Sequence, residues 1–149
     1  MRPDAPLRLR AEDAEDLAVI SAVVQDALVS VQDLTYDRGA NRFTLVANRF
    51  RWEGQPDGPR GAPAYERTVC AITFEAVKGV SYRGFRRRDD ERILSLLAIR
   101  PSEAGTIELE FSGGAALRLA VGAIRVRARD VGEPWPTVWQ PDHEADAQP

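Results

Sequence analysis

The spacing of apolar residues changes near residue 28. In "EDAEDLAVISAVVQDALVSV" apolar side chains recur at steps of three and four, the repeat of one helical face. The residues of this stripe are Leu17, Ile20, Val24, Ala27 and Leu28. Asp13 can cap the amino end, and Asp16 adds a second acid where the helix dipole favours negative charge. The pattern predicts an amphipathic helix of about four turns.

Alternation of apolar and polar residues dominates the rest of the chain. Leu7 and Leu9 alternate with arginines, enough for one short strand before the helix. After residue 28, two strands are joined by the turn "DRGAN", and further strands begin at Thr68. Between them "EGQPDGPRGAPAYE" predicts one long loop. The chain is therefore expected to be α+β, with an N-terminal helix on a mostly antiparallel body of about eight strands.

Two parts of the β region resemble each other. In "CAITFEAVKGVSYRG" and "LRLAVGAIRVRARDVG" the alternation is broken once by a step of three, which predicts a bulge, a sharp bend or a very tight turn. The match extends upstream, so the chain reads as two four-strand units that form a sandwich or partly closed barrel, with the helix over an open side. The strand pattern with this step of three also resembles that of pleckstrin-homology-type β domains, a likeness at the level of fold.

Composition indicates one soluble domain of 149 residues with a net charge of −3. We assign the domain to residues 1–141 and expect residues 142–149 to be disordered. Cys70, the one cysteine, lies in "VCAITFE" and reads as a small core residue. No apolar run is long enough for a membrane span, and no signal core is present. These features predict a cytoplasmic protein that does not bind membranes.

The sequence lacks the residues that most catalytic and cofactor-binding sites require. His143 is the one histidine and lies in the tail, which argues against a nucleophilic triad. One cysteine and one histidine do not make a zinc site, and no glycine-rich phosphate loop precedes a helix. We therefore predict no metal and no cofactor, and the sequence leans against an enzyme without deciding the matter.

Arginine spacing near the end of the chain suggests a charged sheet face. Arg125, Arg127 and Arg129 alternate with apolar residues, so their guanidinium groups share one side of a strand. One interpretation is an anion-binding face. We favour the other, a solvated face neutralised by cross-strand ion pairs, because neighbouring strands are expected to add Glu108 and Glu110.

The stretch "NRFRWE", residues 48–53, places Phe50 and Trp52 out of phase with Phe43. A bulge near Asn48 would return both aromatics to the core and leave the two arginines in solvent. Without a bulge, the aromatics lie on the second face, under the helix or tail, or exposed as a platform. Burial is favoured because an exposed Phe and Trp together promote aggregation. The candidate binding residues are Asn48, Arg49, Arg51, Trp52, Arg125 and Arg127.

The segments "EDLAVISAVVQDALV", "NRFRWE", "LSLLAI" and "DVGEPWPTVWQPDHE" together resemble the domain of unknown function 2948 family, short proteins of alphaproteobacteria. The resemblance covers nearly the whole chain. It implies a small cytoplasmic bacterial protein with no established activity, and it supplies no catalytic residues.

Three functional hypotheses follow. The leading one is a non-catalytic protein-interaction or regulatory module, with a protein partner favoured over nucleic acid and a homodimer left open. The alternative is a small-molecule or anion-binding domain, conceivably enzymatic, whose groups would be Asp26, Asp33, Arg49 and Arg51. The third is RNA binding through the run from Arg86 to Arg88 and the sheet arginines.

Overall fold

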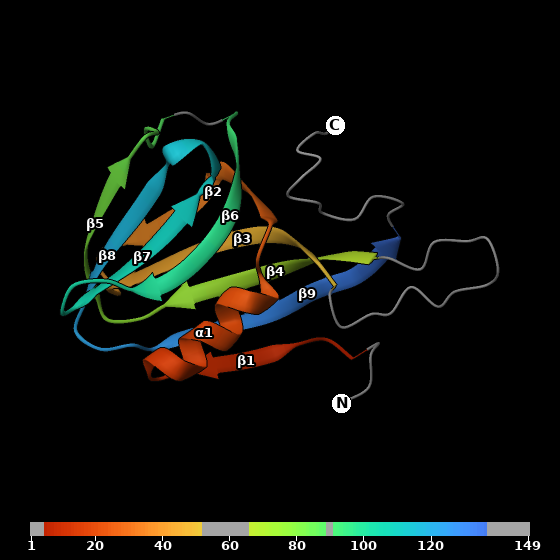
Figure 1. The fold of residues 1–149 in the computed structure, drawn as a ribbon, viewed down its shortest axis with the longest axis horizontal. Coiled ribbons are helices and arrows are strands. Elements are labelled where there is room, and N and C mark those ends of the chain that lie inside the picture. The colour runs from red at the N-terminus through yellow and green to blue at the C-terminus, as the bar shows by residue number, and fades with distance from the viewer. Residues whose placement is uncertain (1–4, 52–65, 89–90, 137–149) are drawn as a thin grey trace.

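The computed structural model describes residues 5–51, 66–88 and 91–136 of the chain. Nine strands form one antiparallel sheet in the order β1-β9-β4-β3-β2-β6-β7-β8-β5 (Figure 1). In chain order the elements are β1 (Arg8–Ala11), α1 (Ala14–Val23), β2 (Ala27–Asp37), β3 (Arg42–Phe50), β4 (Glu66–Phe74), β5 (Val77–Arg83), β6 (Ile93–Pro101), β7 (Thr106–Phe111), the 3₁₀ turn η1 (Ser112–Gly114), β8 (Ala116–Val121) and β9 (Val126–Pro136). The predicted α+β class with a mostly β body is confirmed.

The strand order is symmetric about the pair β2–β6. Strands β2, β3 and β4 form one meander, and β6, β7 and β8 form the other. The strand after each meander joins the opposite one, because β5 pairs with β8 and β9 pairs with β4. The last strand of each predicted four-strand unit thus pairs with a strand of the other unit. The two steps of three fall at these crossovers, and at the first of them Ala76 has a φ of 59°.

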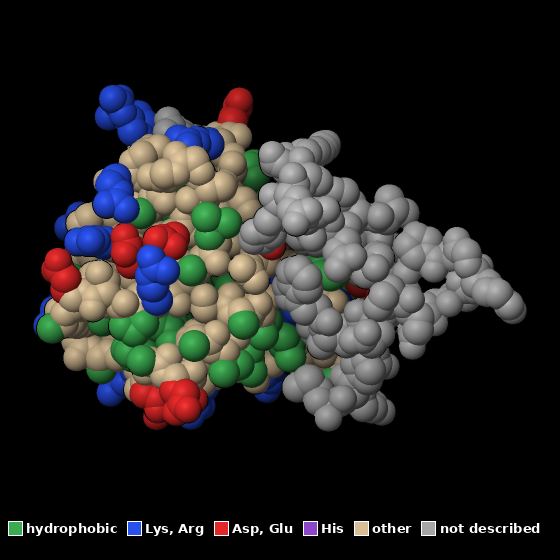
Figure 2. Space-filling view, viewed as in Figure 1, with side chains coloured by type: hydrophobic (Ala, Val, Ile, Leu, Met, Phe, Trp, Pro, Cys, Tyr) green, Lys and Arg blue, Asp and Glu red, His purple; other side chains and the backbone are tan. Residues whose placement is uncertain are grey.

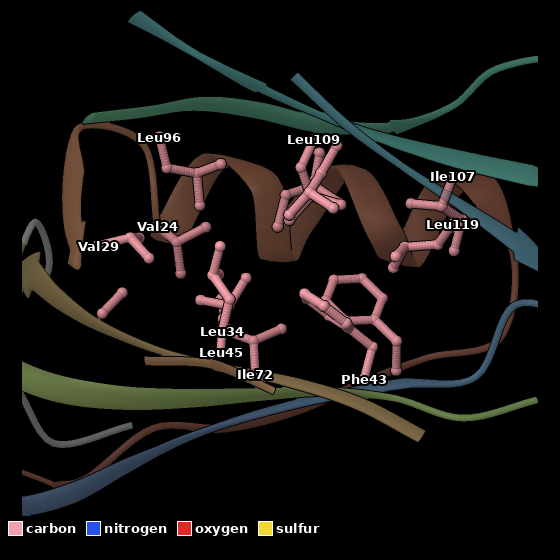
Figure 3. Packing of buried hydrophobic residues seen from close by; sticks show 14 of the residues in the cluster. Val24, Val29, Leu34, Phe43, Leu45, Ile72, Leu96, Ile107, Leu109 and Leu119 are labelled. Atoms are coloured by element: carbon pink, nitrogen blue, oxygen red, sulfur yellow. The ribbon is translucent and has the colours of Figure 1, made fainter. Parts of the chain in front are cut away.

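The sheet folds over on itself, so the inner faces of the two halves meet in one core (Figure 3). Phe43, Leu45 and Ile72 from β3 and β4 lie on one side, opposite Leu96 and Leu109 from β6 and β7. The sheet is not closed into a barrel, since β1 and β5 stand at its two ends. Helix α1 packs against β6 and β1 and covers the core between these strands (Figure 1).

Helix α1 begins where the sequence predicts and ends earlier. Asp13 is the N-cap, and its side chain accepts a hydrogen bond from the Asp16 backbone N–H at 2.8 Å. The helix has ten residues, fewer than the predicted four turns. It stops because Asp26 adopts a φ of 67° and donates its N–H to the Leu96 carbonyl, which directs the chain into β2. Ala27 therefore starts a strand.

Two further expectations can be compared with the structure. Cys70 is a buried core residue, as predicted. Helix α1, the one α-helix of the described residues, is too short to cross a membrane. The tail at 142–149, together with Trp52 and His143, lies outside the described residues.

Candidate functional site

Strand β3 runs without a bulge through the first part of "NRFRWE". Its register with β4 is continuous from the pair Phe43–Phe74 to the pair Phe50–Arg67. Arg49 therefore keeps the phase of Phe43 and points to the inner face, whereas Phe50 lies on the outer face and is still buried. The expected burial of Phe50 is confirmed. The bulge that would leave Arg49 in solvent is absent, and that alternative is wrong.

Arg49 is fully buried and forms a bidentate ion pair with Asp130 of β9. Its Nε donates to Oδ1 at 2.8 Å and its Nη2 donates to Oδ2 at 2.8 Å. Asp130 Oδ2 also accepts the Leu7 N–H at 2.9 Å. The pair thus joins β3, β9 and the residue that precedes β1, so Arg49 acts as an internal anchor.

The neighbouring candidates on β3 also make internal contacts. Arg51 is buried and forms an ion pair with Glu66 of β4. The Asn48 carbonyl accepts a hydrogen bond from Arg67 Nη1 at 3.1 Å. Burial lowers the pKa of the Arg67 guanidinium, and the Asp26 carboxylate partly offsets this. The Arg51 and Arg67 side chains therefore join β3 to β4 and are buried.

The structure separates two of the four residues of the expected pocket of Asp26, Asp33, Arg49 and Arg51. Asp33 is exposed on β2, while Arg49 is fully buried in its pair with Asp130. Asp33 and Arg49 therefore do not share one site.

Exposed arginines instead gather on the outer face of β1 and β9. The register of the two strands sets Arg8 opposite Arg129 and Arg10 opposite Arg127. Strand β4, on the other side of β9, sets Ala71 beside Arg129 and Thr73 beside Arg127. These short side chains leave a hollow of about 490 Å³. We call this site the arginine groove and define it by Arg8, Arg10, Ala71, Thr73, Arg127 and Arg129.

No carboxylate of the described residues lines the arginine groove. At the rim of the groove, Arg127 Nη2 donates a hydrogen bond to Glu75 Oε2 at 2.9 Å, and Arg42 binds the same carboxylate. Within the described ranges, Arg8, Arg10 and Arg129 form no ion pair.

The expected neutralisation of the β9 arginines by Glu108 and Glu110 is wrong. Both glutamates lie on β7, whereas β9 crosses over to lie between β1 and β4. Of the two predicted β9 candidates, Arg127 lines the groove and Arg125 lies just before the strand. Arg125 is exposed, and its carbonyl accepts the Glu75 N–H at 2.9 Å.

The equivalent face of the other half is neutralised. Glu108 stands between Arg100 and Arg118 in the register of β6, β7 and β8. Its carboxylate lies 3.8 Å from Arg118 and 3.4 Å from Arg83, and Glu110 pairs with Arg100. Figure 2 shows red and blue side chains interspersed over this half. The unneutralised groove is therefore a local feature, not a general result of an arginine-rich composition.

Arg86, Arg87 and Arg88, the candidates for RNA contact, are exposed beside a shallow hollow that Tyr82 and Phe85 complete. Burial raises the pKa of the Tyr82 phenol, and the nearby Arg87 partly opposes this. This hollow lies beside β5, at the opposite end of the strand order from β1. The two arginine groups are therefore separate surfaces.

Arginine spacing on β1 and β9 was visible in the sequence. Arg127 is among the predicted binding residues, whereas Arg8 and Arg10 are not. Alternation in "LRLRA" resembles that in "IRVRARD", and this is the signal that could have joined them. The pairing of the two strands was the missing information.

Comparison with known proteins identifies a family and no characterised relative. No curated protein and no solved structure matches the chain. A family model described as "Protein of unknown function (DUF2948)" matches residues 7–143. The match spans every described strand and the helix, so the chain belongs to the DUF2948 family.

Proposed function

We propose that this protein binds an anionic ligand in the arginine groove. The observation that carries the proposal is the cross-strand register of the arginines, Arg8 opposite Arg129 and Arg10 opposite Arg127, in a hollow that no carboxylate of the described residues lines. Like charges directly opposite one another destabilise a sheet. An anion between the guanidinium groups removes that repulsion and gains charge-assisted hydrogen bonds.

The shape of the groove supports binding of a small ligand. Its volume of about 490 Å³ lies within the range of small-molecule sites. The contact with Glu75 holds the Arg127 guanidinium in place before a ligand arrives, which reduces the ordering that binding requires. Because the whole protein carries a net charge of −3, attraction for anions depends on local groups of arginines such as this one.

Calorimetric titration with inorganic phosphate and pyrophosphate at low salt tests the proposal. We expect Arg8→Gln and Arg129→Gln each to weaken binding by about tenfold, or about 1.4 kcal/mol. Arg118→Gln is the matched control, since Arg118 is an exposed strand arginine that is already paired with Glu108. Absence of binding to the native protein, or equal losses in control and groove variants, would refute an anion site in the groove.

A second candidate, a protein contact, is favoured by an exposed apolar surface on the central strands. Leu28 of β2 lies opposite Ser95 of β6, and Ile93 and Leu97 flank Ser95 on the same face. Ile93 is 64% exposed. This surface would bury apolar area against a protein or a second copy of the chain.

Light scattering over a range of concentrations tests the second copy, and co-purification tests other partners. Ile93→Asp should abolish the association, whereas Val19→Asp, an exposed apolar position on α1, should leave it intact. A monomer at every concentration with no captured partner would count against this candidate.

A further inference from the structure

We infer that the ligand of the arginine groove is a compact molecule with two separated phosphate groups, each held by one cross-strand arginine pair. This inference rests on the function proposed above. It follows from the spacing of the guanidinium groups, from the number of donors they offer and from the limits of the positive surface.

The groove has two rows that run across the strands. The first row joins Arg8, Arg129 and Ala71, and the second joins Arg10, Arg127 and Thr73. Neighbouring strands lie about 4.8 Å apart, so the two arginines of one row can converge on one anionic group. Residues two apart on a strand are separated by about 6.7 Å, which sets the distance between the rows. The groove is therefore built for two charged groups with a spacer between them.

The donor set favours phosphate over carboxylate. Each guanidinium offers a planar fork of N–H donors, and two forks meet in each row. A terminal phosphate has three acceptor oxygens and carries more than one negative charge near neutral pH, so it can accept from both forks. A carboxylate can also accept from two guanidinium groups, as Glu75 does from Arg42 and Arg127, but its single charge balances only one of them. Two arginines without a carboxylate partner in one row thus fit one phosphate group.

The surroundings of the groove favour a compact ligand over a nucleic-acid strand. Glu75 stands beyond the second row and binds both Arg127 and Arg42, so the charge of these arginines is partly neutralised in that direction. Beyond the first row the next pair on the same face is Val69 with Val131, which offers no charge. Among the described residues, the arginines that line the hollow are therefore limited to two rows, whereas polynucleotide binding draws on many successive phosphate contacts.

The two rows differ in their free donors. Arg127 of the second row already donates to Glu75, whereas Arg8 and Arg129 of the first row have no ion pair within the described ranges. A single phosphate should therefore occupy the first row. Occupation of the second row should require a ligand that is already anchored in the first, because the second phosphate then binds at high effective concentration.

Titration calorimetry with inorganic phosphate and with straight-chain diol bisphosphates of graded length tests this arrangement. We expect an intermediate spacer, whose phosphates lie about 7 Å apart, to bind at least about tenfold more tightly than inorganic phosphate. Arg129→Gln should weaken both ligands, whereas Arg10→Gln should weaken the bisphosphate and leave inorganic phosphate nearly unchanged. Arg118→Gln, in the neutralised half, should change neither.

Several results separate this inference from the proposed function. If inorganic phosphate binds and Arg129→Gln removes it, but no bisphosphate binds more tightly, the anion site stands and the two-phosphate ligand is wrong. Dicarboxylates of equal length that bind as well as bisphosphates would also overturn the phosphate assignment. Single-stranded oligonucleotides whose affinity rises with length would replace the compact ligand with a nucleic acid. If no anion binds the native protein, both proposals fail.

Discussion

Arg49 and Asp130 form a buried bidentate ion pair in which two guanidinium nitrogens each lie 2.8 Å from a carboxylate oxygen. The pair crosses from β3 over β4 to β9, since β4 separates these strands in the sheet. Asp130 also exchanges hydrogen bonds with Leu7, through its carboxylate and its backbone N–H. One ion pair thereby fixes the edge strand β1 that supplies half of the arginine groove.

Arg49→Met should lower the free energy of unfolding by about 3–5 kcal/mol, because Asp130 would keep a buried charge without its partner. Urea denaturation measures this loss. Arg42→Met is the control, since Arg42 forms an exposed ion pair with Glu75 and should change stability by less than about 1 kcal/mol. Similar small losses for both variants would show that the Arg49 contact contributes little.

Gly84→Ala should destabilise the protein far more than Gly132→Ala. Both glycines have a φ near +80°, so an added Cβ strains the backbone at either position. At Gly84 the Cβ would also lie 2.8 Å from the Gly114 carbonyl oxygen and 2.8 Å from Ala115 Cα, whereas at Gly132 it meets nothing within 4 Å. We expect about 1 kcal/mol for Gly132→Ala and a clearly larger loss for Gly84→Ala. Equal midpoints in thermal unfolding would contradict the close approach of β5 to the β7–β8 turn.

Thr68→Val should leave stability unchanged or raise it by about 1 kcal/mol. The Thr68 side chain is buried opposite Arg49, and its Oγ1 has no hydrogen-bond partner within the part of the chain that the structure describes. Replacing the hydroxyl by a methyl group removes a desolvated polar atom at nearly constant volume. Thr68→Ala, which removes the packing as well, should be less stable than Thr68→Val. A loss for Thr68→Val as large as that for Thr68→Ala would show that the hydroxyl is needed.

Tyr82 should give the protein a pH dependence in the alkaline range. Burial raises the pKa of Tyr82 above the ordinary value of 10.0, so the folded protein holds the phenol proton more tightly than the unfolded chain. This contribution to the free energy of unfolding is present below the unfolded pKa and is lost as pH rises through the folded pKa. Tyr82→Phe should remove this contribution, so the free energy of unfolding measured by urea titration should fall less steeply above about pH 10. An unchanged slope in the variant would disprove the linkage.

Local features were predictable from the sequence because they depend on neighbouring residues. The cap at Asp13, the burial of Cys70 and the breaks after Phe74 and Val121 all follow from local pattern. The alternation along β3 also indicates that Arg49 is buried, since Arg49 lies on the same face of the strand as Phe43. Its partner Asp130 is 81 positions away, and nothing local marks that contact.

The arginine groove could not be derived from the sequence for a related reason. An alternating pattern shows which face of a strand is buried, but it does not show which strand lies next to it. Arg127 was expected near Glu108 because β7, β8 and β9 are consecutive along the chain. The crossover of β9 to β1 and β4 changed the electrostatic conclusion, from a neutralised face to one on which Arg127 alone of the groove arginines has an ion pair within the described residues.

The pairing of β1 with β9 also has a consequence for synthesis and folding. Arg8 and Arg129, which face each other in the groove, come from opposite ends of the described chain. A nascent chain on the ribosome has the first arginine long before the second, so the site is complete only after the last strand has docked. Contacts of such long sequence separation form slowly. Binding in the groove would therefore distinguish finished molecules from partly folded ones, and a ligand would stabilise only the finished molecules.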